Sequence, residues 1–130
     1  MPYDDLLEIL ENEEGFFNHN NFSIEERTKD NVILKALITK NSTNPYGIAH
    51  GGFIFGLGDT VMGMLARKDG RNAVTLNANI TYLKPGTGEY LIAKGEIIKQ
   101  GKSTCYLRAN IYNDEDKLIA TMDSNYFYIN

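Results

Sequence analysis

Asp59 is the side chain in this 130-residue sequence whose surroundings most clearly indicate chemistry. It lies between two largely apolar runs, residues 53–57 and 61–65, which leave no polar face at helical spacing and so predict a buried helix. An ionised carboxylate in such a place is costly unless it is paired, hydrogen-bonded or protonated. Asp59 is therefore either a structural carboxylate held by a cap or an ion pair, or a reactive group.

A pair of glycines at the expected start of the same helix offers a second chemical group. In the segment His50-Gly51-Gly52, the first N–H groups of the helix have no partner within the helix, and the absent side chains let a ligand oxygen approach them. Such a helix start suits an anion or the charge that develops on a carbonyl oxygen. The glycines could equally serve tight packing alone, and His50 could orient a ligand or make a structural hydrogen bond.

The spacing of these groups predicts how they would work together. Asp59 follows His50 by nine residues, which is about 13 Å along a helix. A reacting group held at the helix start is thus too far from Asp59 of the same chain. If both groups serve one reaction, the simplest arrangement is a dimer in which one chain supplies the glycine N–H groups and the other supplies the carboxylate.

Apolar periodicity and turn residues predict the elements that position these groups. Asn44-Pro45-Tyr46-Gly47 is a turn sequence, and the central helix extends from the glycine pair to about Arg67. Its glycines, each costing about 1 kcal/mol relative to alanine, indicate that other backbone approaches the helix closely. Around it we expect a short N-terminal helix over 3–14, two strands within 22–39, and strands near 74–83, 89–99, 103–112 and 117–129.

The connections between these strands predict the fold class. Short connections join antiparallel neighbours in a meander, so we expect an α+β fold with a five- to six-stranded antiparallel sheet around a central buried helix. The whole chain, residues 1–130, forms a single domain in this interpretation. The outer face of the sheet, with Tyr90, Tyr106 and Tyr112 among polar groups, could be covered in part by another subunit.

Composition excludes several classes of function. Thirteen basic residues against seventeen acidic ones give a net charge of −4 with no basic run, which argues against nucleic-acid binding. No apolar run approaches the length of a membrane span, and the start of the chain lacks the pattern of a signal peptide. A single cysteine, Cys105, favours a reducing compartment, so we expect a cytoplasmic protein. The histidines and the cysteine have no metal-ligand spacing, so we expect no metal.

The residues around the helix start resemble the signature of a known family. Asn44, Gly47, His50-Gly51-Gly52, Phe55 and Asp59 are similar to the motif of hot-dog-fold acyl-CoA thioesterases of the phenylacetic-acid-degradation type. Weaker similarity continues through residues 75–85, 100–103 and 118–120, so the resemblance extends from about Val32 to the C-terminus. It implies a hot-dog fold, an active site at a dimer interface, and a homodimer or a homotetramer built as a dimer of dimers.

The resemblance also implies a role for each matching residue. Asp59 would be the general base or the nucleophile, and the N–H group of Gly51 or Gly52 would polarise the thioester carbonyl. Asn44 would orient the thioester or the water, Thr75 would help to hold the water, and His50 would brace the loop. No separate cofactor is implied, because coenzyme A is part of the substrate. Its phosphates need cations, for which the candidates are Lys84, Lys99, Lys102, Arg67 and Lys68.

Two other readings of the sequence stay open. A non-catalytic acyl-CoA-binding protein on the same fold would bind the ligand without turnover. A structural dimer in which Asp59 forms an ion pair would neither bind acyl-CoA nor hydrolyse it. The sequence leaves open the acyl group that is preferred, and whether Asp59 acts as base or as nucleophile.

Overall fold

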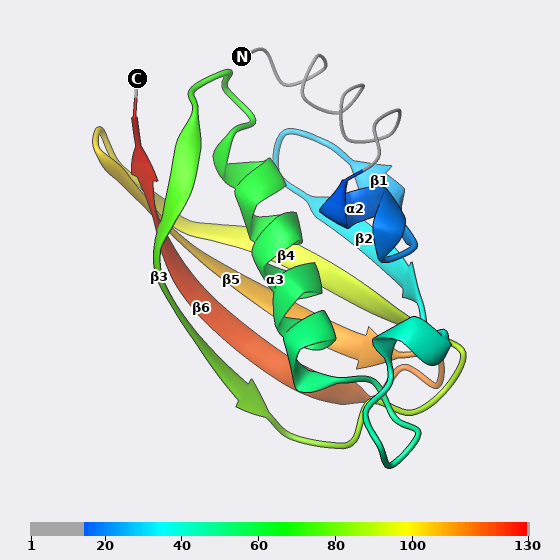
Figure 1. The fold of residues 1–130 in the computed structure, drawn as a ribbon. Coiled ribbons are helices and arrows are strands. Elements are labelled where there is room, and N and C mark those ends of the chain that lie inside the picture. Colours follow the sequence, from blue (N-terminus) through cyan, green and yellow to red (C-terminus); the bar gives the residue numbers. More distant parts are fainter. Residues whose placement is uncertain (1–14, 130) are drawn as a thin grey trace.

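One curved, six-stranded antiparallel sheet packs around a single long helix in the computed structural model, which describes residues 15–129 (Figure 1). Because the sheet curves, its concave face encloses the helix, α3. The strands are β1 (Phe22–Arg27), β2 (Val32–Leu37), β3 (Ala73–Tyr82), β4 (Tyr90–Gln100), β5 (Thr104–Asn113) and β6 (Leu118–Tyr128), and the helices are α2 (Phe16–His19), η1 (Lys40–Ser42) and α3 (Gly51–Ala66). The helix expected over 3–14 lies outside the described residues.

The order of the strands is β1-β2-β4-β5-β6-β3. The predicted meander is confirmed for β4, β5 and β6, but it is wrong for β3 and β4, which are not neighbours. The reason is that α3 carries the chain across the concave face from β2 to the opposite edge, where β3 pairs with β6. The loop over 83–89 then crosses three strand spacings, about 14 Å, which seven residues span easily. This topology makes β3 an edge strand.

Helix α3 forms the centre of the core, as its apolar sequence predicts. Its residues Leu57, Val61, Met62 and Leu65 are completely buried against the sheet. The prediction that its glycines admit neighbouring backbone is wrong at Gly56, Gly58 and Gly63, where side chains lie against the helix. A Cβ atom at Gly58 would overlap the sulfur of Met122, and one at Gly63 would lie 3.3 Å from the ring of Tyr126.

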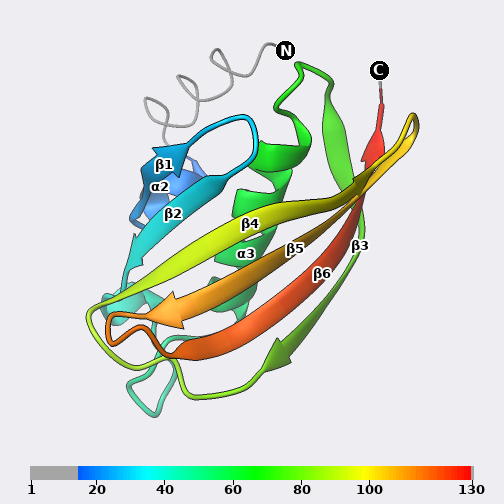
Figure 2. The same cartoon turned by 180° about the vertical axis from the view of Figure 1, so that it is seen from behind.

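The convex face of the sheet carries a mixture of rings and charges. No described helix covers this face, as the view from behind shows (Figure 2). The ammonium group of Lys35 lies 4.3 Å from the ring centroid of Tyr90, and Arg108 forms an ion pair of 2.8 Å with Asp123. Whether another subunit covers part of this face stays a prediction.

None of the helices within residues 15–129 is long and apolar enough to cross a membrane. The cytoplasmic location stays a prediction from cysteine usage.

Candidate active site

Asp59 lies in the middle of α3 and is held by two hydroxyl groups from the sheet. The hydroxyl of Thr75, on β3, donates to Asp59 Oδ1 over 2.8 Å. The hydroxyl of Tyr126, on β6, reaches the same Oδ1 and also donates to the backbone carbonyl of Asp59 over 2.6 Å. Within residues 15–129, no group donates to the second carboxylate oxygen, Oδ2. Oδ1 is therefore held in place by the sheet, and Oδ2 is available to water or a ligand.

The surroundings of Asp59 bear on the structural alternative. Among the described residues, no Lys, Arg or His nitrogen lies within 4.0 Å of its carboxylate. Arg67 lines the same pocket, of about 300 Å³, but its guanidinium donates to the backbone carbonyl of Ala73 over 2.7 Å. The described part of the chain thus offers no ion pair to Asp59, so the structural alternative in which an ion pair holds this carboxylate finds no partner there.

A β-bulge brings Thr75 to Asp59. Simple alternation along 74–83 places Thr75 on the face opposite Ala78 and Ile80, both of which pack against the core. The β3–β6 register shifts between Thr75 and Asn77, which leaves Leu76 without a partner and 59% exposed. Such a bulge re-aims the side chains on one side of it. Thr75 can therefore face α3 together with Ala78 and Ile80.

His50 caps the start of α3. Its Nδ1 accepts a hydrogen bond of 2.8 Å from the N–H of Gly52, and its own backbone N–H donates to the buried Ser42. Within the described chain, the N–H of Gly51 has no acceptor, while its carbonyl accepts from Tyr82 over 2.7 Å. Of the two glycine N–H groups, that of Gly51 is the one left for a ligand.

Asn44 organises the loop before the helix. Its Oδ1 accepts from the backbone N–H of Tyr46 over 3.0 Å and of Ile48 over 3.4 Å. Gly47 follows in a left-handed conformation with φ of +80°, which glycine adopts without strain. Asn44 and Gly51 share a groove of about 390 Å³. The side-chain oxygen of Asn44 is thus used by the loop, and its side-chain nitrogen, Nδ2, is the atom that could reach a ligand.

The five basic candidates fall into two groups. Lys84 lines the groove beside Gly51. Arg67, Lys68, Lys99 and Lys102 lie instead toward the other end of α3, where the β4–β5 turn meets the end of the helix (Figure 1). The structure does not bring all five together, so they cannot form one phosphate site within a single chain.

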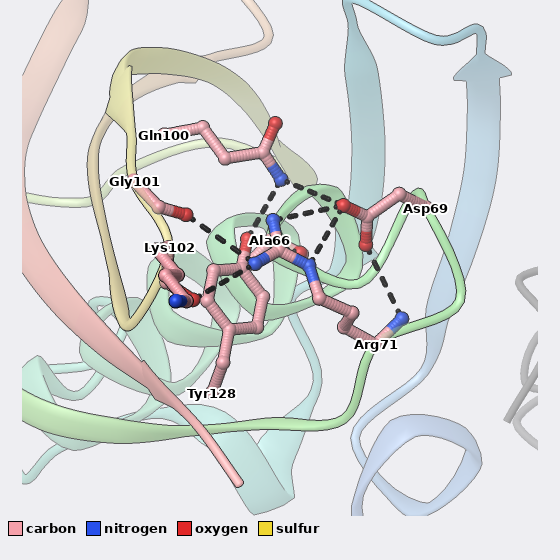
Figure 3. A network of polar contacts seen from close by, with 7 residues as sticks. All are labelled: Ala66, Asp69, Arg71, Gln100, Gly101, Lys102 and Tyr128. Carbon is pink, nitrogen blue, oxygen red and sulfur yellow. Dashed lines mark hydrogen bonds and ion pairs between the residues drawn. The ribbon is translucent and has the colours of Figure 1, made fainter. Parts of the chain in front are cut away.

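A second polar group, which we call the Arg71 cluster, consists of Asp69, Arg71, Gln100 and Tyr128 (Figure 3). Arg71 pairs with Asp69 over 2.9 Å and lies 3.7 Å from the centroid of the Tyr128 ring. Partial burial alone would raise the pKa of Asp69, but the hydrogen bonds and charge of Arg71 outweigh it and lower that pKa. Tyr128 donates to the carbonyl of Ala66 over 2.7 Å, and burial raises its pKa to about 12.

Sequence reasoning missed Tyr126 and the Arg71 cluster. Tyr126 is only 1% exposed, and alternation along 118–128 places it on the inner face with Met122 and Ser124. Nothing in that alternation connects it to Asp59, which is 67 residues away in the chain. Burial and the charge of Asp59 raise the pKa of Tyr126, so its hydroxyl remains a donor at neutral pH.

The structure also bears on two further predictions, a packed Cys105 and the absence of a metal site. Cys105 is completely buried, and burial raises the pKa of its thiol, which suits a packed side chain. Within residues 15–129, no three histidine, cysteine, aspartate or glutamate side chains gather where they could hold a metal ion. The absence of a metal stays a prediction.

Residues 46–120 match the family model described as the thioesterase superfamily. The chain belongs to the thioesterase superfamily. In sequence it is 32% identical over 93 residues to human acyl-coenzyme A thioesterase 13, a match covering 68% of this chain and 66% of that protein. It is 30% identical over 90 residues to the acyl-coenzyme A thioesterase PaaI of Escherichia coli, covering 68% and 64%. These matches thus span less than two thirds of the length of either relative.

Solved structures of thioesterase superfamily members confirm the hot-dog fold expected from the sequence. The E. coli PaaI structure superposes with a TM-score of 0.91 over 98% of this chain and 93% of that chain, at 23% identity, and so shows the fold. A hypothetical thioesterase from Streptococcus pneumoniae, crystallised with coenzyme A, is 34% identical with a TM-score of 0.79 over 84% and 89%. The resemblance to thioesterases of the phenylacetic-acid-degradation type is therefore confirmed, while the role of each site residue stays a prediction.

Proposed function

We propose that this protein is an acyl-CoA thioesterase, which hydrolyses a thioester to a free acid and coenzyme A, with Asp59 as its catalytic carboxylate. The observation that carries the proposal is the hydrogen bonding of the two Asp59 carboxylate oxygens in a thioesterase-superfamily fold. One oxygen is fixed by Thr75 and Tyr126, the other has no described donor, and a pocket lies beside it. A carboxylate held in this way can act as a base or as a nucleophile.

Either of two routes completes the hydrolysis. In the first, Asp59 takes a proton from a water molecule while the water oxygen attacks the carbonyl carbon; the C–S bond then breaks and the thiolate of coenzyme A leaves. In the second, Asp59 itself attacks, expels the thiolate and forms a mixed anhydride, which water then cleaves to the acid. In both, negative charge develops on the carbonyl oxygen, where the N–H of Gly51 would stabilise it.

The proposal needs a second copy of the chain. Gly51 and Asp59 are eight residues apart on α3, which is about 12 Å. One thioester cannot meet both groups of one chain, so the carboxylate of one protomer would face the helix start of its partner. The surface that fits this role is β3, an edge strand with exposed Val74 (46%) and Leu76 (59%) on either side of Thr75. We therefore expect a homodimer or a dimer of dimers.

The binding of coenzyme A follows from the same geometry. The S. pneumoniae relative was crystallised with coenzyme A, which supports a site for this group in the present fold. Lys84 lines the groove at the helix start and is the candidate closest to Gly51. The cations toward the other end of α3, Arg67, Lys68, Lys99 and Lys102, would contribute only from the partner protomer.

The test is a panel of acyl-CoA esters with short, medium, long and aromatic acyl groups, with release of the free thiol as the readout. Turnover of at least one ester by the wild type, and its loss in Asp59→Ala, would support the proposal. Thermal stabilisation by coenzyme A without release of thiol from any ester would favour the non-catalytic binding protein instead. Unchanged turnover in Asp59→Ala would exclude Asp59 from the chemistry.

A further inference from the structure

Tyr126 approaches Asp59 from the core of the same chain. Its ring is 1% exposed, and its hydroxyl lies within hydrogen-bonding reach of both the backbone carbonyl and the Oδ1 atom of Asp59. A hydroxyl carries a single proton, so it either shares that proton between the two oxygens or alternates between them. In both cases it fixes the side-chain torsion of Asp59 relative to the helix backbone.

Helix α3 leaves room for this approach at Gly63. Residues four apart lie above one another on a helix, so Gly63 is on the same face as Asp59. A Cβ atom at position 63 would lie 2.7 Å from a guanidinium nitrogen of Arg67, 3.3 Å from a ring carbon of Tyr126 and 3.4 Å from its hydroxyl oxygen. The missing side chain therefore leaves room on this face of α3 for both the Arg67 guanidinium and the Tyr126 ring.

Tyr128 provides the internal comparison. It follows Tyr126 by two residues on β6, faces the same way, and its hydroxyl donates to the carbonyl of Ala66 over 2.7 Å. The corresponding bond of Tyr126, to the carbonyl of Asp59, is 2.6 Å. Both tyrosines thus attach α3 to the sheet through one backbone carbonyl, and within the described chain only Tyr126 also donates to a carboxylate on the helix.

We propose that Tyr126 is a positioning residue for the catalytic carboxylate, holding Asp59 Oδ1 together with Thr75 so that Oδ2 is the oxygen that meets water or thioester. This inference rests on the proposed function. Burial and the charge of Asp59 raise the pKa of Tyr126, so the hydroxyl donates over the whole working range of pH.

The other groups that face Asp59 limit the expected change in the pH profile of activity. On its own helix, Arg67 is the charged side chain that lines the same pocket, with Thr60 and Met64 as uncharged neighbours. From β3 the neighbour is Thr75, which does not titrate, and from β6 it is Tyr126. Removal of the Tyr126 hydroxyl should therefore leave one positive charge nearby and take away one donor.

The experiment compares Tyr126→Phe with Tyr128→Phe on the acyl-CoA ester that the wild type hydrolyses fastest. For Tyr126→Phe we expect kcat to fall roughly 10- to 100-fold because the carboxylate is no longer held in position, with KM changed less than kcat. The acidic limb of its pH profile should move to higher pH, since the carboxylate loses a donor. Tyr128→Phe loses an equivalent bond to the helix backbone and should keep both the rate and the profile.

The outcomes separate this inference from the proposed function. Wild-type turnover that disappears in Asp59→Ala but persists in Tyr126→Phe, with an unchanged pH profile, would overturn the inference alone. Equal losses in Tyr126→Phe and Tyr128→Phe, with neither profile shifted, would also overturn it by assigning both tyrosines to the fold. A wild type without turnover would remove the proposed function and the inference together.

A second variant covers the case in which Tyr126→Phe does not fold. Replacement of Tyr126 alone by 3-fluorotyrosine keeps the ring and the hydroxyl but makes that hydroxyl a stronger donor. The acidic limb of the profile should then move to lower pH, opposite to the shift expected for phenylalanine. A profile that superposes on that of the wild type would contradict the inference.

Discussion

Two clusters of polar side chains lie along α3, and they differ in what they leave unsatisfied. Each contains an aspartate and a tyrosine of β6 that donates to a helix carbonyl. In the Arg71 cluster, both oxygens of Asp69 accept hydrogen bonds from Arg71, whose positive charge neutralises the carboxylate. Around Asp59, one oxygen accepts from two neutral hydroxyl groups, and no cation among the described residues pairs with it.

This difference separates a cluster that holds the fold together from one that keeps a group available. The Arg71 cluster joins the end of α3 to the β4–β5 turn, because Arg71 also donates to the carbonyls of Gly101 and Lys102 (Figure 3). Within the described residues, both oxygens of Asp69 and the guanidinium of Arg71 are used in hydrogen bonds. The Asp59 cluster retains a carboxylate oxygen beside a pocket, where water or a ligand can reach it.

The largest expected effect on activity comes from Asp59→Asn, which replaces one carboxylate oxygen by an amide nitrogen, with Asp69→Asn as the comparison. Asp59→Asn should lower kcat/KM roughly 10²- to 10⁴-fold, because the amide can neither accept a proton from water nor attack the thioester. Asp69→Asn should leave turnover unchanged and lower the free energy of unfolding by less than about 1 kcal/mol, since the Asp69–Arg71 pair is partly exposed. Steady-state kinetics and urea unfolding of both variants test the comparison, and equal losses of activity would contradict it.

An intermediate effect is expected at the helix start. Gly51→Pro removes the one N–H group that we assign to the carbonyl oxygen, and proline is well tolerated at the first position of a helix. His50 precedes it with φ of −65° and ψ of 140°, a conformation compatible with a following proline. We expect kcat to fall roughly 10²- to 10³-fold, as for the loss of one oxyanion donor.

Gly51→Ala is the matched control for this substitution. It places a Cβ atom at the same site, 3.1 Å from the hydroxyl oxygen of Tyr82, and keeps the N–H group. It should therefore retain most of the activity that Gly51→Pro loses. If alanine and proline reduce kcat by the same factor, crowding and not the N–H group determines the loss.

The local features of the fold and the site could be predicted from the sequence, whereas the other features depend on contacts between distant residues. The apolar helix, the glycine pair and the isolated Asp59 are local patterns, so the fold class and the main candidates could be predicted. The sheet order could not, because the seven-residue loop over 83–89 is as compatible with a crossing as with a hairpin. Thr75 was named only through the family resemblance, since simple alternation misplaces it and the bulge at Leu76 corrects its direction.

The smallest expected effect is a dependence of stability on alkaline pH. A tyrosine in an unfolded chain has a pKa of about 10, and burial raises that of Tyr128 to about 12 in the folded protein. Its protonated form therefore contributes stability that is fully present below pH 10 and is lost as pH rises from there through 12. Urea unfolding at pH 8, 10 and 11 should show a shallower decline for Tyr128→Phe than for the wild type, and parallel curves would contradict the assignment.

The most direct test of the central claim is complementation between two inactive variants. Asp59→Asn and Gly51→Pro are co-expressed with different tags, and the doubly tagged oligomer is isolated and assayed for release of thiol. If the carboxylate of one protomer serves the helix start of its partner, each mixed dimer regains one intact site of two. The isolated mixed dimers should then have about half of the wild-type activity, since one of their two equivalent sites is intact. Mixed dimers that form but remain as inactive as their parents would contradict a site shared between two chains.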